Sequence, residues 1–469
     1  MLHTRKTRQK QKYHRSTYYL LTLIIIIMTT ACAPVGSPQG GSASTSSGDS
    51  YSEPSIVTES ETGASDDGAS PADSSGPTIV TGGDRDESAE SISPAPRPTS
   101  RPAERPQQSA DLKAGEVDDN EDWADYLDYR RNYRGPRVHD RDISERYIIE
   151  AIDKNGHPVL NANVRIYLDN QGQSEEIYEG YTYADGRALF HPKTLGHSAR
   201  YGDQFLAIVK KNNAIAKVKM KRSYQQGHNS EQVWTVKLDI TQQVSSVNLD
   251  VLFLLDATGS MGDEIHAIQS TIFDVAERID NLPERPNVRY GLVTYRDRGD
   301  AYISKTYGFE NNVAQFSRNL DTVYANGGGD YPESLNEGLH KALHNVTWRS
   351  DDTVRLIFLV ADAPPHLDYR NDYDYAIEME TAARSAIKVF PIASSGLDEQ
   401  GEYIFRQIAQ FTQGRFIFLT YDGPSNGGKS GDVTTHNVDS YSVSSLDSLL
   451  VDLVTYELSH QNPLLSWRQ

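Results

Sequence analysis

Apolar residues in the second half of the chain alternate between short continuous runs and helically spaced positions. Asp250–Leu255 is apolar after its first residue, which is typical of a central parallel strand. Apolar residues at 265, 268, 272, 275 and 279 then recur at helical spacing. Repetition of this alternation predicts an α/β domain over residues 246–460, built on a doubly wound, Rossmann-like sheet. The further predicted elements are the strands Val288–Tyr295, Arg355–Ala361, Val389–Ala393 and Arg415–Leu419, an edge hairpin through Tyr302–Phe309, a helix with Val313, Phe316 and Leu320, a helix led by Pro332, and the helices Tyr373–Lys388, Glu402–Phe411 and Leu446–Leu458.

Residues 146–245 follow a different pattern. Short β-rich runs alternate with turns that contain Asn or Gly, and no helical period is present. This spacing favours a small antiparallel β-sandwich. Its predicted strands include Tyr147–Ile152, Val164–Leu168, Gln204–Lys210 and Ile215–Met220. The preceding segment, 113–145, holds a few large apolar residues around Trp123 and is expected to form one short helix.

Composition changes the picture at the start of the chain. Residues 33–112 are mostly Ser, Gly, Pro, Thr, Asp and Glu, so we expect a disordered, acidic tether. Asp and Glu outnumber Lys and Arg by 65 to 46, and the net charge of -19 excludes nucleic acid as a partner. The one cysteine, Cys32, excludes an intramolecular disulfide, a Cys-rich zinc module and an iron–sulfur cluster.

Residues 1–32 have the organisation of an export signal. A basic segment without acids precedes an apolar run, 18–28, that is too short to span a bilayer comfortably. The next residues, Thr29-Thr-Ala-Cys32, resemble the lipobox of bacterial lipoproteins, although Thr29 stands where that family usually has Leu. The resemblance implies that lipid is attached to Cys32 and anchors the protein, outside the cytoplasm, to a bacterial cell membrane or outer membrane. An ordinary signal peptide cleaved after Ala31 is the alternative.

Polar residues follow three of the predicted strands. Asp256-Ala-Thr258-Gly-Ser260 comes after the first strand of the α/β domain, Asp330 lies in the glycine-rich loop 326–334, and Asp362 follows Arg355–Ala361. In a doubly wound sheet, binding sites form at the carboxyl ends of the strands. We therefore expect these side chains to share one site.

The three motifs, in this order, resemble the metal-ion-dependent adhesion site (MIDAS) of von Willebrand factor type A domains, whose first motif is Asp-x-Ser-x-Ser. Thr258 replaces the first Ser and keeps the hydroxyl group. The resemblance implies a Mg²⁺ ion, with Mn²⁺ and Ca²⁺ as alternatives, because oxygen ligands from separate loops suit these ions. Thr258 and Ser260 would bind directly, Asp256 and Asp362 mostly through water, and Asp330 directly or through water. An acidic group of a partner protein would complete the coordination.

The β-rich region resembles prealbumin-like and carboxypeptidase-regulatory-like domains of bacterial surface proteins, through the stretches 153–164 and 182–192. In those modules Gly and Asp form turns, so the resemblance implies a fold and no chemistry. Calcium binding by Asp153 and Asp185 is the weaker interpretation, because neither lies in an Asp-x-Asp-x-Asp run.

Other interpretations of the polar motifs have less support. One alternative is that residues 256–260 form only a helix-capping turn. A phosphate-binding loop is a second alternative, but it would need a Gly-Lys-Ser/Thr ending, which this stretch lacks. His266 and His366 lack zinc-ligand spacing or an accompanying nucleophile, so we expect them at loop and surface positions. Arg298-Gly-Asp300 spells an integrin-recognition tripeptide, for which we expect a structural turn.

The sequence thus predicts a cell-surface binding protein whose α/β domain engages a protein or peptide ligand through a divalent ion. No nucleophile–base, paired-acid or metal-hydrolase motif accompanies the site, so we do not expect an enzyme. The alternative is an accessory or assembly subunit that positions partners for a separate ATPase, peptidase or secretion complex.

Overall fold

The computed structural model describes residues 112–170, 173–222, 230–242, 247–283, 285–422, 431–438 and 441–461. The predicted signal segment 1–32, its lipidation site Cys32 and the predicted tether up to residue 111 lie outside the described residues. Within the described part of the chain, every helix is too short or too polar to cross a membrane.

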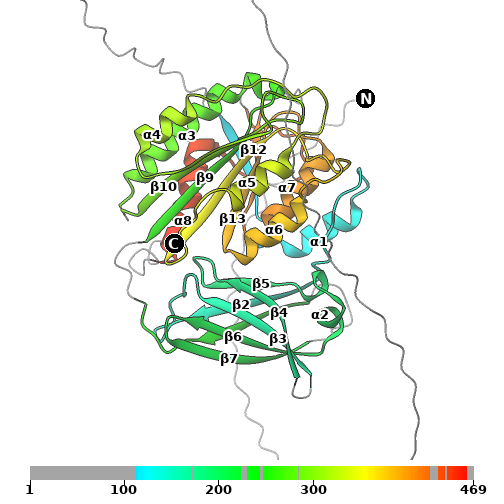
Figure 1. Ribbon diagram of the computed structural model, residues 1–469, viewed down its shortest axis with the longest axis vertical. Helices are drawn as coiled ribbons and strands as arrows, with labels where there is room; N and C mark the ends of the chain where they lie inside the picture. Colours follow the sequence, from blue (N-terminus) through cyan, green and yellow to red (C-terminus); the bar gives the residue numbers. More distant parts are fainter. Residues whose placement is uncertain are drawn as a thin grey trace, which may run out of the picture. The chain divides into compact units, whose positions relative to one another are not determined.

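An eight-stranded, mostly parallel sheet forms the centre of the α/β domain (Figure 1). The strand order is β11-β10-β9-β12-β13-β14-β1-β15. β9 pairs in parallel with β10 and β12, whereas β11 and β1 pair antiparallel with their neighbours. The predicted mixed α/β, Rossmann-like fold class is confirmed. The strands are β9 (Asn248–Asp256), β10 (Asn287–Tyr295), β11 (Ser304–Glu310), β12 (Thr353–Ala361), β13 (Ile387–Ala393), β14 (Phe416–Thr420), β1 (Lys113–Val117) and β15 (Val443–Ser445).

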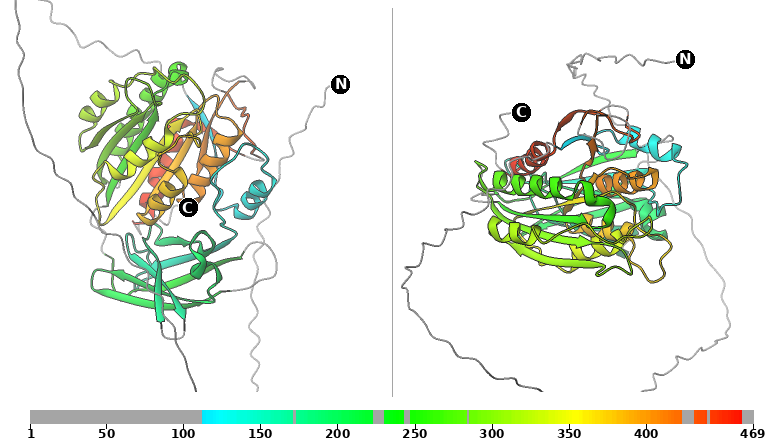
Figure 2. Two further views of the ribbon diagram at one scale, coloured as in Figure 1. Left: turned by 45° about the vertical axis from the view of Figure 1, so that its right-hand side comes forward. Right: turned by 90° about the horizontal axis from the view of Figure 1, so that it is seen from above.

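Helices cover both faces of this sheet, as the two views of Figure 2 show. Along β9, Val251, Phe253 and Leu255 enter the core under α3, α4 and α8, whereas Leu252 and Leu254 enter the core under α5, α6 and α7. A strand buried on both faces has to be apolar at successive positions, which explains the continuous run in the sequence. The helices are α3 (Ile265–Asp280), α4 (Val313–Leu320), α5 (Leu335–His344), α6 (Tyr375–Arg384), α7 (Glu399–Phe411) and α8 (Leu446–Ser459).

Among the described residues, three helices begin at side-chain caps that fix their starts. At α4, the side chain of Asn312 accepts a hydrogen bond from the backbone of Gln315. Asp374 accepts a hydrogen bond from the backbone of Ala376 at α6, and Asp398 accepts one from Gly401 at α7. The helix predicted over Tyr373–Lys388 is therefore shorter at both ends, because Asp374 caps it and Lys388 already belongs to β13.

The segment before the β region also belongs to the α/β domain, which the predicted boundary at 246 did not include. Besides the expected helix α1 (Trp123–Asn132), the segment contains β1, which pairs with β14 from Val117↔Phe416 to Lys113↔Thr420 and also pairs with β15. Trp123 and other residues of α1 pack into the core under α5, α6 and α7. The predicted domain order is corrected accordingly: the β region is inserted into the α/β domain, between β1 and β9.

Two sheets, ordered β5-β2-β8 and β4-β3-β6-β7, share one apolar core in residues 145–237. The prediction of a purely antiparallel arrangement was wrong for one pair, because β2 and β8 run parallel over eight residues each. The resemblance to prealbumin-like modules stays a prediction, and we refer to this part as the two-sheet domain. Its elements are β2 (Glu145–Ile152), β3 (Asn163–Asn170), β4 (Gln173–Tyr181), β5 (Arg187–Phe190), η1 (Pro192–Thr194), α2 (His197–Tyr201), β6 (Gln204–Lys211), β7 (Ala214–Lys221) and β8 (Ser230–Lys237).

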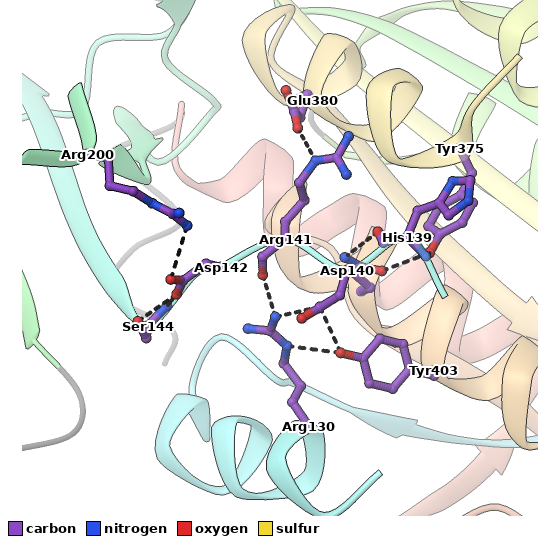
Figure 3. Close-up of polar contacts among 11 residues, drawn as sticks. Arg130, His139, Asp140, Arg141, Asp142, Ser144, Arg200, Tyr375, Glu380 and Tyr403 are labelled. Atoms are coloured by element: carbon purple, nitrogen blue, oxygen red, sulfur yellow. Dashed lines mark hydrogen bonds and ion pairs between the residues drawn. The ribbon is translucent and has the colours of Figure 1, made fainter. Parts of the chain in front are cut away.

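Polar contacts hold the connection between α1 and β2 against α6 and α7 (Figure 3). Asp140 pairs with Arg130 of α1 and accepts a hydrogen bond of 2.8 Å from the hydroxyl of Tyr403 on α7. Arg141 donates to Glu380 of α6. The connection is thus attached to the same helices that cover this face of the sheet.

Candidate metal centre

The first predicted motif lies where β9 ends. Asp256 is the last residue of β9 and is fully buried. Its Oδ1 accepts hydrogen bonds from the backbone N–H of Thr258 at 2.9 Å and from the Thr258 hydroxyl at 2.6 Å. The Thr258 hydroxyl also lies 3.2 Å from that of Ser260, which is exposed. Thr258 makes no side-chain capping bond to the short helix η2 (Gly259–Asp263), so the hydroxyl side chains point to a shared site and not to a helix end.

Asp362 reaches the same site from the neighbouring strand. β12 pairs in parallel with β9 up to Val360↔Leu255, so the residues that follow the two strands emerge at one edge of the sheet. Asp362 is 5% exposed. Burial raises its pKa, and a hydrogen bond from Ser260 opposes that rise. Burial and then the charge of Asp362 raise the pKa of Asp256, which shows that the two carboxylates are neighbours.

A third buried carboxylate at this edge is Glu333. It lies two residues before α5, and its main chain bonds to the loop after β12: its N–H donates to Pro364, and its carbonyl accepts from His366. Burial, followed by the charges of Asp256, Asp297, Asp362 and Asp300, raises the pKa of Glu333 to about 9. Glu333 lies in the glycine-rich loop 326–334, but it is not among the site residues predicted from the sequence.

Three oxygens of these carboxylates are buried and have no hydrogen-bond partner in the part of the chain that the structure describes: Oδ2 of Asp256, Oε2 of Glu333 and Oδ1 of Asp362. Among the described residues, no Lys or Arg pairs with any of the three. A buried anion without a counter-charge is strongly unfavourable, and burying several together is more so. The charge distribution of this edge therefore favours a bound cation, and its oxygen-only groups suit Mg²⁺, Mn²⁺ or Ca²⁺.

Glycines bring the loop 326–328 close to the end of β9. The N–H of Gly259 donates to the carbonyl of Gly327 at 3.0 Å. Gly328 has a φ of +70°, and a Cβ atom there would lie 2.7 Å from Oε1 of Glu333. Its N–H donates to Asp300, which also accepts from the N–H of Asp297. Asp300 thus stabilises the turn and this loop, in agreement with the structural interpretation of the Arg-Gly-Asp tripeptide.

Asp330 is exposed and belongs to a different group from the one expected. Single ligand atoms of Asp330, Asp297 and His366 lie within 4.8 Å of one another. His366 is 3% exposed, which differs from the surface position predicted for it, because it is enclosed between Asp297 and the ring of Tyr369. Direct coordination of the ion by Asp330 stays a prediction. His266 is exposed on α3, as predicted.

Residues 250–421 match a family model described as von Willebrand factor A domain. The chain therefore contains a domain of this class, called the A domain below, and domains of this class typically bind protein ligands or mediate adhesion.

Three proteins illustrate the similarity. The alpha-protein kinase vwkA of Dictyostelium discoideum is 29% identical over 165 residues, 35% of this chain and 25% of that protein. The human von Willebrand factor A domain-containing protein 7 is 35% identical over 128 residues, 27% of this chain and 13% of that protein. The chain thus spans a quarter or less of these relatives. The solved structure of proximal thread matrix protein 1 from the mussel byssus, with a zinc-occupied MIDAS motif, is 16% identical, with 46% of each chain covered and a TM-score of 0.33.

Proposed function

We propose that the chain is a cell-surface binding protein whose A domain engages a protein or peptide ligand through a divalent cation. The observation that carries this proposal is the group of three buried carboxylates with unpaired oxygens at the carboxyl edge of β9 and β12. Asp256, Thr258, Ser260, Glu333 and Asp362 would hold the ion, and Mg²⁺ fits their oxygens best. The proposal assigns no catalytic step to the chain.

The exposure of Ser260 suggests where the ligand would bind. Asp256, Glu333 and Asp362 are buried behind the site, whereas Ser260 is exposed. A cation held here would attract a carboxylate of the partner from the solvent side, and the carboxylates behind it would weaken that attraction by lowering the ion's effective charge. An acidic residue of a protein ligand is therefore the expected contact.

Thermal unfolding of the full chain tests the metal site. A cation that binds only the folded state raises the free energy of unfolding by about 2.7 kcal/mol when its free concentration is about 100 times its Kd. For a domain of this size, that increase corresponds to a rise in Tm of roughly 5–10 °C. We expect this rise with Mg²⁺ after treatment with EDTA, and we expect Asp362→Ala and Ser260→Ala to abolish it. Asp452→Asn, at an exposed position of α8, is the matched control and should keep it. A Tm that does not respond to Mg²⁺, Mn²⁺ or Ca²⁺ would contradict the proposal.

We also propose that lipid on Cys32 anchors the protein outside the cytoplasm, as the lipobox-like sequence implies. This part rests on the sequence alone. Fractionation of cells that express the full chain tests it, with Cys32→Ala as the variant. The variant should be released from membranes, and unchanged membrane association would rule out a lipid anchor.

A further inference from the structure

A second group of metal-ligand side chains lies away from the carboxylates at the end of β9. His340 and His344 stand one turn apart on α5, and Glu378 faces them from α6, the adjacent helix (Figure 1). Nδ1 of His340 lies 2.8 Å from Oε1 of Glu378, and Nε2 of His344 lies 2.9 Å from Oε2. One ligand atom from each of the three residues falls within 4.8 Å of the other two.

The surroundings hold this group in place but leave one side open. The Glu378 side chain is 6% exposed and that of His340 is 20% exposed, whereas His344 is 42% exposed. The ring of Tyr373 stacks on His340 with a centroid distance of 3.5 Å and an interplanar angle of 7°. Both oxygens of Glu378 therefore face imidazole nitrogens from a buried position, and solvent reaches the group beside His344.

The donor set differs from that of the carboxylate edge. Two histidines at i and i+4 of a helix present their nitrogens to the same ion, as in helical zinc sites. Zn²⁺ takes His nitrogens and carboxylate oxygens at about 2.0–2.2 Å, with four ligands in a tetrahedron. Imidazole favours zinc and its neighbouring transition metals over Mg²⁺ and Ca²⁺.

We propose that His340, His344 and Glu378 form a Zn²⁺ site, with solvent or a partner's side chain at the fourth position. The spacing His340-Lys-Ala-Leu-His344 has Lys341 where helical zinc hydrolases carry their glutamate base, so we assign the site no hydrolytic role. Zinc here joins α5 to α6. α5 begins two residues after Glu333, so Zn²⁺ would also restrict the motion of the helix next to this carboxylate of the other site.

Titration calorimetry of the full chain, with metal removed and an excess of Mg²⁺ added, tests the site. The excess of Mg²⁺ competes at the carboxylate edge, and Zn²⁺ is the titrant. We expect one equivalent of Zn²⁺ to bind. We expect His344→Gln to weaken Zn²⁺ binding by at least about 10-fold, because removing a direct ligand should cost no less than removing an outer-shell contact. Glu378→Gln should give a similar loss, and Co²⁺ should develop tetrahedral visible absorption only when both residues are intact.

Two control variants separate this site from the carboxylate edge. His197→Gln changes an exposed histidine of α2, and Asp362→Asn removes a carboxylate of the other site; both should leave Zn²⁺ affinity unchanged. His344 is exposed, so His344→Gln should fold, which far-ultraviolet circular dichroism can verify. The proposal is overturned if no Zn²⁺ binds, if the Zn²⁺ affinity of folded His344→Gln equals that of the unchanged protein, or if Asp362→Asn abolishes binding.

Discussion

Asp250 and Asp256 stand on the same strand, β9, and both are fully buried, yet their charges are balanced in different ways. Arg289 donates to both oxygens of Asp250, at 2.9 and 2.6 Å, and Arg349 lies 3.2 Å away. Asp256 has hydrogen bonds from Thr258 on one oxygen and no partner on the other. The chain itself supplies the counter-charge at one end of β9, and at the other end the proposed cation would supply it.

Two other buried acids follow the pattern of Asp250. Asp119 pairs with Arg406 on α7, and Glu457 pairs with Lys388 on β13. The comparison teaches that burial of a carboxylate says little about function in this protein. What distinguishes the carboxyl edge, among the described residues, is that its buried carboxylates have both an oxygen without a hydrogen-bond partner and no Lys or Arg beside them.

The largest effect is expected at Asp250. Asp250→Asn leaves two arginines without their shared carboxylate, and loss of one partner of a buried ion pair typically costs about 3–5 kcal/mol. Chemical denaturation of the full chain should show this loss equally in EDTA and in Mg²⁺. If Mg²⁺ restored much of the lost stability, the two ends of β9 would not differ as we describe.

An intermediate effect should separate Glu333 from Asp330. Glu333→Gln removes a buried carboxylate next to Asp256, and we expect Mg²⁺ affinity to fall by at least about 10-fold, the lower end of the loss seen when an outer-shell contact is removed. Asp330→Asn is the matched variant in the same loop, and its exposed side chain should matter less. Calorimetric titration with Mg²⁺ compares them; a larger loss in Asp330→Asn would favour the ligand predicted from the sequence.

The third effect concerns pH. The pKa of Glu333 is about 9 in the folded protein, against 4.5 for an ordinary glutamate, so between these values the folded state holds a proton that the unfolded state has released. The free energy of unfolding of the metal-free protein should therefore fall as pH rises through this window. Tm should fall with it, by roughly 2–4 °C for each kcal/mol lost. Tm measured at pH 5 and pH 8 should show a smaller fall in Glu333→Gln, or when Mg²⁺ replaces the proton. An identical fall in the variant would show that Glu333 does not titrate here.

The sequence predicted the A domain fold well because β9 and its neighbours are buried on both faces and carry continuous apolar runs. It also placed Asp256, Thr258, Ser260 and Asp362 at one edge, since parallel neighbours end together. It selected Asp330 and not Glu333, because both are acids in one glycine-rich loop and only the path of that loop decides which is buried.

Pairing between distant segments was the other gap. The residues of β1, Lys-Ala-Gly-Glu-Val, have little strand pattern of their own, and they form a strand because β14 and β15 offer hydrogen bonds on both sides. No local turn signal predicts the parallel pairing of β2 with β8 either, because parallel strands are joined by a long connection and not by a tight turn.

The position of β1 determines how the molecule would respond to tensile force. A pull on the chain upstream of Lys113 would reach the sheet of the A domain first, through a strand hydrogen-bonded on both edges. The two-sheet domain follows β1 and α1 in the chain and would feel no tension until both had detached. If the chain is anchored and holds a ligand on the A domain, as proposed, a load between the two would pass through the A domain and spare the inserted domain.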